Sequence, residues 1–310
     1  MIQSERVKPM LERVRCGEIL ISDGAMGTFL HSQGLGSGEC PESWCISHPE
    51  VVRGIAAAYV AAGSDIVETN SFGGSSFRLK AYQLADQVRE FNLAAAALAR
   101  EAIGDKGYVA ASVGPTGQFV EDEGGDISRE QLYDSFAEQI KALADGGADA
   151  ICIETMSSLI EAIQAIRAAK ENTALPVICT FTFDAKPRGF FTMMGVTPER
   201  AVVGAVEAGA DIVGANCGNG IANMIEITRR IRVAVPGIPI LIQANAGTPI
   251  IEDGKTVFKE TPEFMASRME ELIRAGANII GGCCGTTPDH ITAMAKSARN
   301  FVATGGICKS

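Results

Sequence analysis

Short apolar runs rich in β-branched residues recur along the chain, each preceded by a glycine and one or two small or polar residues. The clearest copies are "AAGSDIVETN" (61–70), "GGADAICIET" (146–155), "AGADIVGANC" (208–217) and "AGANIIGGCC" (275–284). Glycine suits the left-handed residue that ends a helix, and a continuous apolar run suits a strand buried on both faces. The pattern therefore predicts four buried strands, each following a helix.

Four further apolar runs fit the same role and bring the predicted strands to eight; they are 18–25, 107–116, 175–183 and 238–247. Between the strands lie alanine-rich stretches of helical period, at 49–63, 77–104, 127–147, 158–172, 197–210, 220–235, 261–277 and 287–303. Several of these begin with Thr-Pro or with Ser or Thr followed by an acid, which is typical of a helix N-terminus.

Eight strand–helix units in one chain predict an α/β fold, a (β/α)8 TIM barrel forming a single domain over residues 1–310. We expect residues 1–17 to form an N-terminal helix covering the barrel, 18–303 the barrel and 304–310 a tail. An open doubly wound sheet is the alternative. Eight near-equal units without a G-x-G-x-x-G fingerprint favour the closed barrel.

Composition and charge narrow the possible functions. A formal net charge of −10 argues against general binding to nucleic-acid phosphates or to anionic membranes, because both need clustered Lys and Arg. No signal peptide or long apolar span is visible, and the nine cysteines indicate reduced thiols and metal binding rather than disulfides. We therefore expect a cytoplasmic protein with a small-molecule substrate.

The predicted strands end in polar residues. Those ends read Asp23-Gly24, Glu68-Thr69-Asn70, Gly114-Pro115-Thr116, Glu154-Thr155, Thr182-Phe183-Asp184, Asn216-Cys217, Asn245-Ala246-Gly247 and Cys283-Cys284. Because the carboxyl ends of barrel strands converge, carboxylates, amides and thiols should line one pocket there.

Three of these strand-end residues are cysteines. Cys217 closes the sixth predicted strand, and Cys283 with Cys284 close the eighth, so the three sulfurs can face one space. Three Cys ligands leave one tetrahedral position of Zn²⁺ open, as in catalytic sites. Zinc carrying three thiolates suits activation of a substrate thiol better than activation of water, so the ligand set favours thiol alkylation.

The other cysteines carry no such pattern. Cys152 and Cys179 lie inside predicted strands and fit small buried hydrophobic residues. The remaining four lie in helix, loop or tail, at Cys16, Cys40, Cys45 and Cys308.

At these residues the sequence resembles the homocysteine S-methyltransferase family. "GANC" (214–217) with "GGCCGTTPDHI" (281–291) is similar to its zinc signature. Further matches are "DGAMGT" (23–28), "ETNSFG" (68–73), "GPTG" (114–117), "ET" (154–155), "FTFD" (181–184) and "NAG" (245–247). The "DGAMGT" form most resembles the homocysteine-binding module of cobalamin-dependent methionine synthase.

The resemblance implies a zinc-dependent methyltransferase that makes methionine from homocysteine. Zinc would be held by Cys217, Cys283 and Cys284, with the homocysteine thiolate as fourth ligand and methyl acceptor. Asp23 and Glu154 would hold the amino group, and the backbone amides of Gly24, Ala25 and Met26 would meet the carboxylate. Glu68, Thr69 and Asn70 would line the pocket or bond to neighbouring loops, and no catalytic side chain beyond the zinc-activated thiol is implied.

The methyl donor is left open. The chain ends at residue 310 without a cobalamin module, so we expect a methylated corrinoid protein in trans, or else a small sulfonium or ammonium compound. Apolar residues at Phe190, Phe191, Met193 and Met194 are either ordinary packing or a sign of a different methylated substrate or thiol. A non-catalytic zinc-containing binding subunit is the remaining alternative.

Several other features have a plain structural interpretation. The acidic segment "VEDEGGDIS" (120–128) reads as a solvated loop, with a docking patch for a basic partner as the alternative. The three histidines, His31, His48 and His290, receive no catalytic role. Trp44 either caps the pocket or packs the first long connection. Asn216 and Asn245 are expected to orient loops around the metal.

Overall fold

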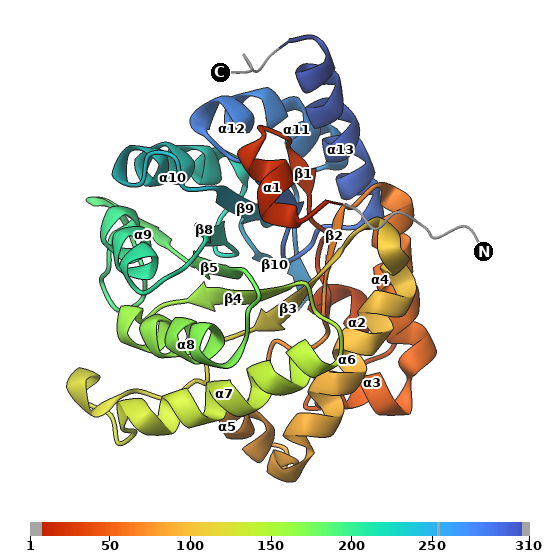
Figure 1. Cartoon of the computed structure of the whole chain (residues 1–310). Coiled ribbons are helices and arrows are strands. Elements are labelled where there is room, and N and C mark those ends of the chain that lie inside the picture. Colours follow the sequence, from red (N-terminus) through yellow and green to blue (C-terminus); the bar gives the residue numbers. More distant parts are fainter. Residues whose placement is uncertain (1–7, 253–254, 306–310) are drawn as a thin grey trace.

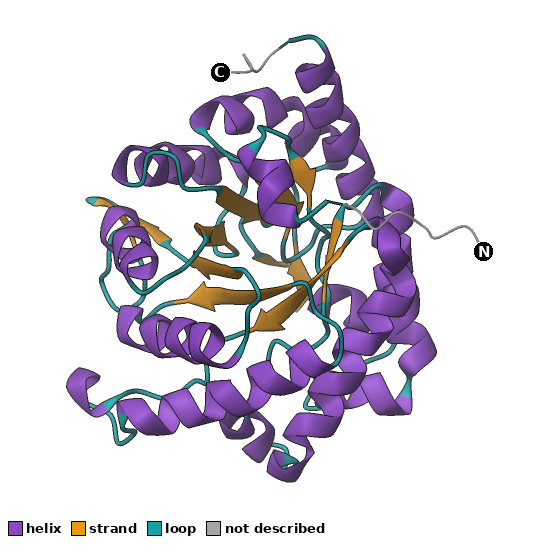
Figure 2. Cartoon of the chain, viewed as in Figure 1, coloured by secondary structure: helices purple, strands orange, loops and turns teal. Residues whose placement is uncertain are grey.

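The structure is a computed structural model that describes residues 8–252 and 255–305. Its central element is an eight-stranded parallel sheet with the order β1-β12-β9-β8-β5-β4-β3-β2. Helices surround the strands on all sides, as Figures 1 and 2 show. The arrangement confirms the predicted (β/α)8 barrel. Residues 1–7, 253–254 and 306–310 lie outside the described residues, and Cys308 is one of them.

Seven of the eight barrel strands fall inside the predicted runs, and β4 extends one residue past its run of 146–155. The strands are β1 (Leu20–Ile21), β2 (Ile66–Glu68), β3 (Tyr108–Val113), β4 (Ala150–Met156), β5 (Val177–Phe181), β8 (Ile212–Asn216), β9 (Ile240–Ala244) and β12 (Ile279–Gly282). Two short hairpins project from the loops after β5 and β9: β6 (Asp184–Lys186) with β7 (Gly189–Phe191), and β10 (Ile250–Glu252) with β11 (Lys255–Val257).

The outer helices largely follow the predicted pattern. They are α4 (Pro49–Ala62), α6 (Val88–Ile103), α7 (Arg129–Asp145), α8 (Leu159–Asn172), α9 (Pro198–Glu207), α10 (Ile221–Ala234), α11 (Pro262–Ser267), α12 (Met269–Ala275) and α13 (Pro288–Ala303). Left-handed glycines end α4 and α12, Gly63 at φ 105° and Gly276 at φ 117°, as the repeated sequence phrase predicts.

Two predicted helices are each broken in two. The stretch 77–104 divides into α5 (Ser76–Lys80) and α6, because Gln83 takes a left-handed conformation (φ 62°) that a helix cannot contain. The stretch 261–277 divides at Arg268, whose ψ of 0° ends α11 before α12 begins. Helical periodicity continues through both breaks, which is why the sequence pattern did not reveal them.

The barrel interior is filled at its lower end by apolar side chains. One buried cluster combines inward residues of the strands, such as Ile66, Cys152 and Ile178, with Met10 and Val14 of α1 (Met10–Arg15). In Figure 1 α1 lies across this end of the barrel. In the described part of the chain, α1 therefore packs against the lower end of the barrel.

Between β1 and β2 the barrel is held partly by side-chain carboxylates, whereas the other neighbouring strands are joined by backbone hydrogen bonds. The Asp65 N–H donates to the Ile21 carbonyl at 2.7 Å, and the Ile21 N–H donates to Asp65 Oδ2 at 2.9 Å. At the carboxyl ends of the same two strands, the Glu68 N–H donates to Asp23 Oδ2 at 2.8 Å. Carboxylate side chains thus replace part of the backbone ladder along this seam.

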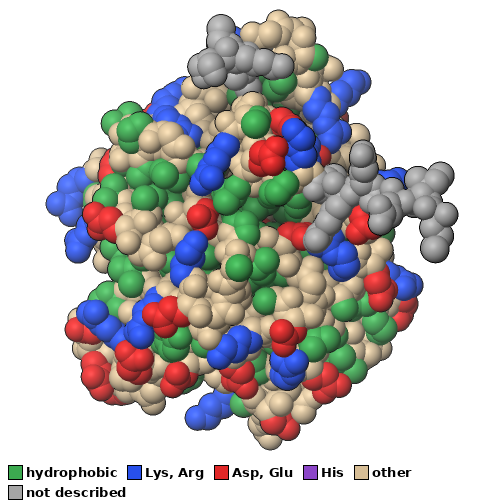
Figure 3. All heavy atoms as spheres, viewed as in Figure 1, with side chains coloured by type: hydrophobic (Ala, Val, Ile, Leu, Met, Phe, Trp, Pro, Cys, Tyr) green, Lys and Arg blue, Asp and Glu red, His purple; other side chains and the backbone are tan. Residues whose placement is uncertain are grey.

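On the face that carries α1, acidic and basic side chains are interspersed, and no patch of one sign dominates (Figure 3). No helix in the described part of the chain is both long and apolar enough to cross a bilayer.

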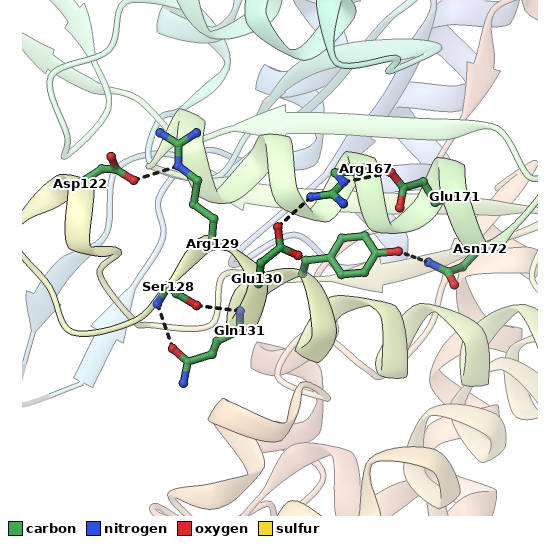
Figure 4. A network of polar contacts seen from close by, with 9 residues as sticks. Asp122, Ser128, Arg129, Glu130, Gln131, Arg167, Glu171 and Asn172 are labelled. Carbon is green, nitrogen blue, oxygen red and sulfur yellow. Dashed lines mark hydrogen bonds and ion pairs between the residues drawn. The ribbon is translucent and has the colours of Figure 1, made fainter.

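The acidic segment 120–128 is tied to its own neighbourhood. Figure 4 shows the Arg129 guanidinium against Asp122, at 2.8 Å, and the Ser128–Gln131 capping box that begins α7. Glu123 accepts a hydrogen bond from Ser158 at 2.7 Å. Because Asp122 and Glu123 already have partners within the chain, segment 120–128 fits an ordinary surface loop better than a docking patch.

Candidate active site

The upper layer of the barrel interior is polar, although it is built by the same strands as the apolar lower layer. Side chains two residues apart on a strand point to the same face. Two residues above the buried apolar layer, or four in the case of Asn216, six of the eight strands therefore contribute an inward polar group. These residues are Glu68, Ser112, Glu154, Thr180, Asn216 and Gln243. Hydrogen bonds join Ser112, Glu154, Asn216 and Thr180 into one network, and a separate hydrogen bond pairs Gln243 with Glu68.

A cavity of about 260 Å³ opens above this layer, at the carboxyl ends of the strands. Its walls include the Gly24–Thr28 loop, three cysteines, and the carboxyl groups of Glu42, Glu68 and Glu154. Of the described residues, none lining it is Lys or Arg. A cavity of this size and character suits a small cationic molecule.

Cys217, Cys283 and Cys284 meet at one side of the cavity, as predicted. Their sulfur atoms all lie within 4.8 Å of one another, and Cys217 Sγ is 3.8 Å from Cys284 Sγ. Cys217 has a left-handed backbone (φ 58°), rare for a residue with a side chain. Its N–H donates to the Gln243 carbonyl at 3.1 Å, and the Cys283 N–H donates to the Ala244 carbonyl at 2.8 Å.

The three thiols change one another's pKa values through mutual hydrogen bonds. Hydrogen bonds from Cys283 and Cys284 lower the pKa of Cys217 to about 3. The same contacts with Cys217 raise the pKa of Cys284 to about 12 and that of Cys283 well above its usual range. A soft divalent cation would let all three sulfurs ionise, so the donor set fits zinc.

Glu154, at the end of β4, lies among neutral donors. Ser112 Oγ donates to its Oε1, and Asn216 Nδ2 donates to its Oε2 at 2.9 Å. Asn216 also accepts from the Thr155 N–H at 2.8 Å, which holds Thr155 in a left-handed conformation (φ 59°). Burial, with repulsion from Glu68, raises the pKa of Glu154 well above its usual range. Asn216 thus orients the carboxyl group rather than the metal ligands alone.

Asp23 and Glu68 form a second pair of acids at the seam. Asp23 is 1% exposed and does not line the cavity, whereas Glu68 is partly exposed and does. Burial raises the pKa of Asp23 to about 7. Burial, reinforced by Asp23, raises the pKa of Glu68 to about 8. Burial thus disfavours the charged form of both acids, and a nearby cation would favour it.

The loop after β1 is braced against the loop after β12. The Ala25 N–H donates to Thr286 Oγ1 at 3.2 Å, and Thr286 Oγ1 donates to the Cys283 carbonyl at 2.7 Å. Tyr59 Oη donates to the Ala25 carbonyl at 2.9 Å. A side chain at Gly24 would come within 2.9 Å of both Thr286 and Tyr59, so only glycine fits there. This brace fixes the Gly24–Met26 backbone relative to the thiols.

Asn70 holds the connection that roofs the cavity. Its Nδ2 donates to the Pro41 carbonyl at 2.8 Å, and its own carbonyl accepts from Cys45 Sγ at 3.4 Å. Glu42 accepts from the Gly73 N–H at 2.7 Å beside it. Asn70 lines the cavity, and it also makes the neighbouring-loop contacts that the sequence left as the alternative.

The remaining candidates have structural roles. His290 caps α13 with Thr287 and contacts the Glu260 carbonyl at 2.9 Å. Trp44 is buried and stacks on His48 at 4.2 Å between ring centroids, so it packs the first connection. Phe190 and Met194 pack against the core, which favours the packing interpretation, while Met193 is 68% exposed.

Sequence reasoning missed several residues of this site. Gln243 lines the cavity, and Ser112, Thr180, Thr286 and Tyr59 position its walls. Counting by twos from the buried residues of each strand would have identified the first three, since that parity decides which side chains face inward. Tyr59 belongs to α4 and has no local signal.

A parallel barrel with a thiol triad and buried acids in one strand-end cavity has the architecture of a barrel enzyme, with a donor set that could hold a metal beside a small polar substrate. The family model for homocysteine S-methyltransferase matches residues 20–298. The chain therefore belongs to the homocysteine S-methyltransferase family, a family of methyltransferases.

The similar proteins agree with this assignment. Methionine synthases of Mycobacterium leprae and Mycobacterium tuberculosis are each 31% identical, over 89% and 91% of this chain. The chain spans about a quarter of their length, 24% and 25%. The metallated form of the homocysteine methyltransferase MmuM from Escherichia coli shares the fold, with a TM-score of 0.75 and 24% identity over 91% of this chain and 96% of that one.

Proposed function

We propose that the protein is a zinc-dependent methyltransferase that methylates the sulfur of homocysteine to give methionine. The observation that carries the proposal is the shared cavity: three thiols on one side, buried carboxyl groups on another, and a backbone loop between them. Homocysteine has a thiol, an ammonium and a carboxylate, and each has a matching group in this cavity.

The chain's own residues would bind and orient the substrate. Cys217, Cys283 and Cys284 would hold zinc, which when bound supplies a site where a substrate thiol is deprotonated and nucleophilic. Glu154 would accept the ammonium, with Asp23 adding negative charge behind it. The Ala25 N–H is engaged by Thr286, which leaves those of its neighbours Gly24 and Met26 for the carboxylate.

The methyl donor is a second part of the proposal. The cavity is small, so a large donor would have to present its methyl group at the mouth, above the thiols. Similarity to methionine synthases, of which this chain matches about a quarter, supports a donor carried by a separate module or protein. We propose a methylated corrinoid protein as that donor.

The test uses the zinc-loaded protein and homocysteine, with homoserine as the matched control because it replaces the sulfur by oxygen. Zinc X-ray absorption should show an added sulfur neighbour with homocysteine and no change with homoserine. With methylcobalamin present, mass spectrometry should detect methionine. An unchanged zinc spectrum at saturating homocysteine would overturn the proposal. Methionine formed from a small sulfonium donor but not from methylcobalamin would overturn the corrinoid part alone.

A further inference from the structure

A second cavity, here called the lower cavity, lies at the end of the barrel opposite the candidate active site. Its volume is about 380 Å³. Its walls come from α1 and the link to β1, from the end of α10 with the link to β9, and from the end of α12 with the link to β12. This is the end across which α1 lies in Figure 1. A space of this size can hold a small molecule.

Both charged side chains that line the lower cavity are arginines. Arg15 stands in the last turn of α1 and Arg232 in the last turn of α10, and no carboxyl group among the described residues lines this space. Val14, Ile19 and Ile273 form an apolar side of the same cavity. Because the whole chain carries a net charge of −10, a cavity with only positive charge differs from its surroundings.

Arg232 is a half-buried cation without a charged partner. Its terminal nitrogens donate to the carbonyls of Ile238 and Gly276, each at 2.8 Å, and to Asn278 Oδ1 at 2.9 Å. Within the described residues it makes no ion pair, and burial lowers its pKa. A buried charge is normally paired, because its removal from water costs free energy. An anion in the lower cavity would supply the missing partner.

The remaining donors of the two arginines are available to such an anion. Within the described part of the chain, no group accepts from Arg232 Nε. A side chain at Gly276 would come within 2.6 Å of this nitrogen, so glycine keeps its edge open. Arg15 is exposed and makes no ion pair with any described residue, whereas the nearby acid Glu18 is held by Arg13 at 2.8 Å.

We propose that the lower cavity binds a small organic oxyanion, a phosphate or carboxylate joined to an apolar group. Arg15 and Arg232 Nε donate to its oxygens, since guanidinium groups form strong charge-assisted hydrogen bonds with such anions. Val14, Ile19 and Ile273 contact the apolar group. A ligand held between α1, α10 and α12 stabilises the folded state without entering the upper cavity. The inference does not depend on the proposed function.

The experiment uses the full chain and three probes of similar size, phenyl phosphate, benzoate and the neutral molecule phenol. Calorimetry at low salt measures their dissociation constants, and thermal unfolding measures the stabilisation. At least one of the two anions should bind and raise the unfolding temperature, and the tighter one identifies the preferred oxyanion. Phenol should not bind. Added salt should weaken the binding, because partly exposed charges are screened.

Two variants test the position of the site. Arg15→Glu changes an exposed residue and places a carboxylate in the cavity, so it should keep the fold and weaken anion binding at least about tenfold. Arg232→Met should do the same, and should it unfold, Arg15→Glu alone decides. The matched control is Arg274→Gln, because Arg274 lies on α12 outside the cavity and pairs with Glu270 at 2.9 Å. This control should bind the anion as wild type does.

Three results would overturn the inference. The first is absence of binding by both phenyl phosphate and benzoate at low salt. The second is equal binding by wild type and Arg15→Glu, since the anion would then lie elsewhere. The third is an equal loss in Arg15→Glu and Arg274→Gln, which would reduce the effect to net charge. Homocysteine binding by the zinc-loaded wild type tests the proposed function separately, so the two failures are distinguishable.

Discussion

The lower and upper halves of the barrel interior differ in chemistry, although the same strands build both. Residues of the two halves stand two positions apart along a strand. Below, Ile66, Cys152 and Ile178 pack against α1 in a dry apolar layer. Above, Glu68 and Glu154 lie in a layer of carboxyl, amide and hydroxyl groups. The lower layer should determine stability with little effect on activity, whereas the upper layer should determine activity and the pH dependence of stability.

The sharpest test of this division is Cys284→Ala at the top. Loss of one of three thiols should abolish stable zinc binding, and activity should fall roughly a thousandfold or more, since several kcal/mol of barrier lowering depend on the metal. Metal analysis and methionine formation measure the two effects. Cys179→Ala, a buried cysteine away from the triad, is the control and should keep its zinc. Full zinc in Cys284→Ala would refute the assigned ligands.

At the bottom, Ile178→Ala should lower the free energy of unfolding by about 2–5 kcal/mol, because a fully buried side chain leaves a cavity. Urea denaturation measures the change. Below the unfolding transition, kcat and KM should stay close to the wild-type values. A large change in kcat without loss of stability would show that the two layers are not separable.

The pH dependence of stability should come mainly from the upper layer. Asp23 and Glu68 have pKa values of about 7 and about 8 in the folded protein, above those of the unfolded chain, so the folded state binds their protons more tightly. Their contribution is complete below about pH 4 and is lost as pH rises through 7 to 8.

Without ligand, the free energy of unfolding should therefore fall as pH rises from about 5 to 9, and Asp23→Asn should flatten the curve. Denaturant titrations at several pH values measure the slope. A wild-type curve that rises over this range would mean that the acids are ionised and paired in the folded state.

The smallest expected effect is that of Tyr59→Phe, which removes the hydroxyl that braces Ala25 against the thiol loop. A lost hydrogen bond of about 1 kcal/mol should raise the KM for homocysteine about fivefold, with zinc content and kcat little changed. A larger fall in kcat than rise in KM would place Tyr59 in the chemical step.

The fold could be predicted almost completely from the sequence, because strand runs and helix caps are local signals. All eight strands coincide with predicted runs to within one residue, while the breaks at Gln83 and Arg268 depend on backbone conformations that periodicity does not record. The thiol triad could also be predicted, since Cys217, Cys283 and Cys284 stand at strand ends.

The arrangement of the carboxyl groups in the cavity was harder to predict. Strand ends identify Asp23 and Glu154, yet they do not say which carboxyl faces the cavity and which faces the seam. That depends on the register of β1 against β2, where a two-residue strand meets its neighbour through side chains instead of a ladder. Gln243 was missed because it lies inside an apolar run, where only counting by twos from Leu241 places its side chain on the inward face.

The seam between β1 and β2 also provides a natural reporter. The Glu68 N–H donates to the Asp23 carboxylate, and the side chain of the same residue faces the cavity. The chemical shift and solvent exchange of this one amide proton should respond both to ionisation of Asp23 and to a ligand arriving at Glu68. A single backbone resonance would thus register the state of the barrel's closure and the occupancy of its site together.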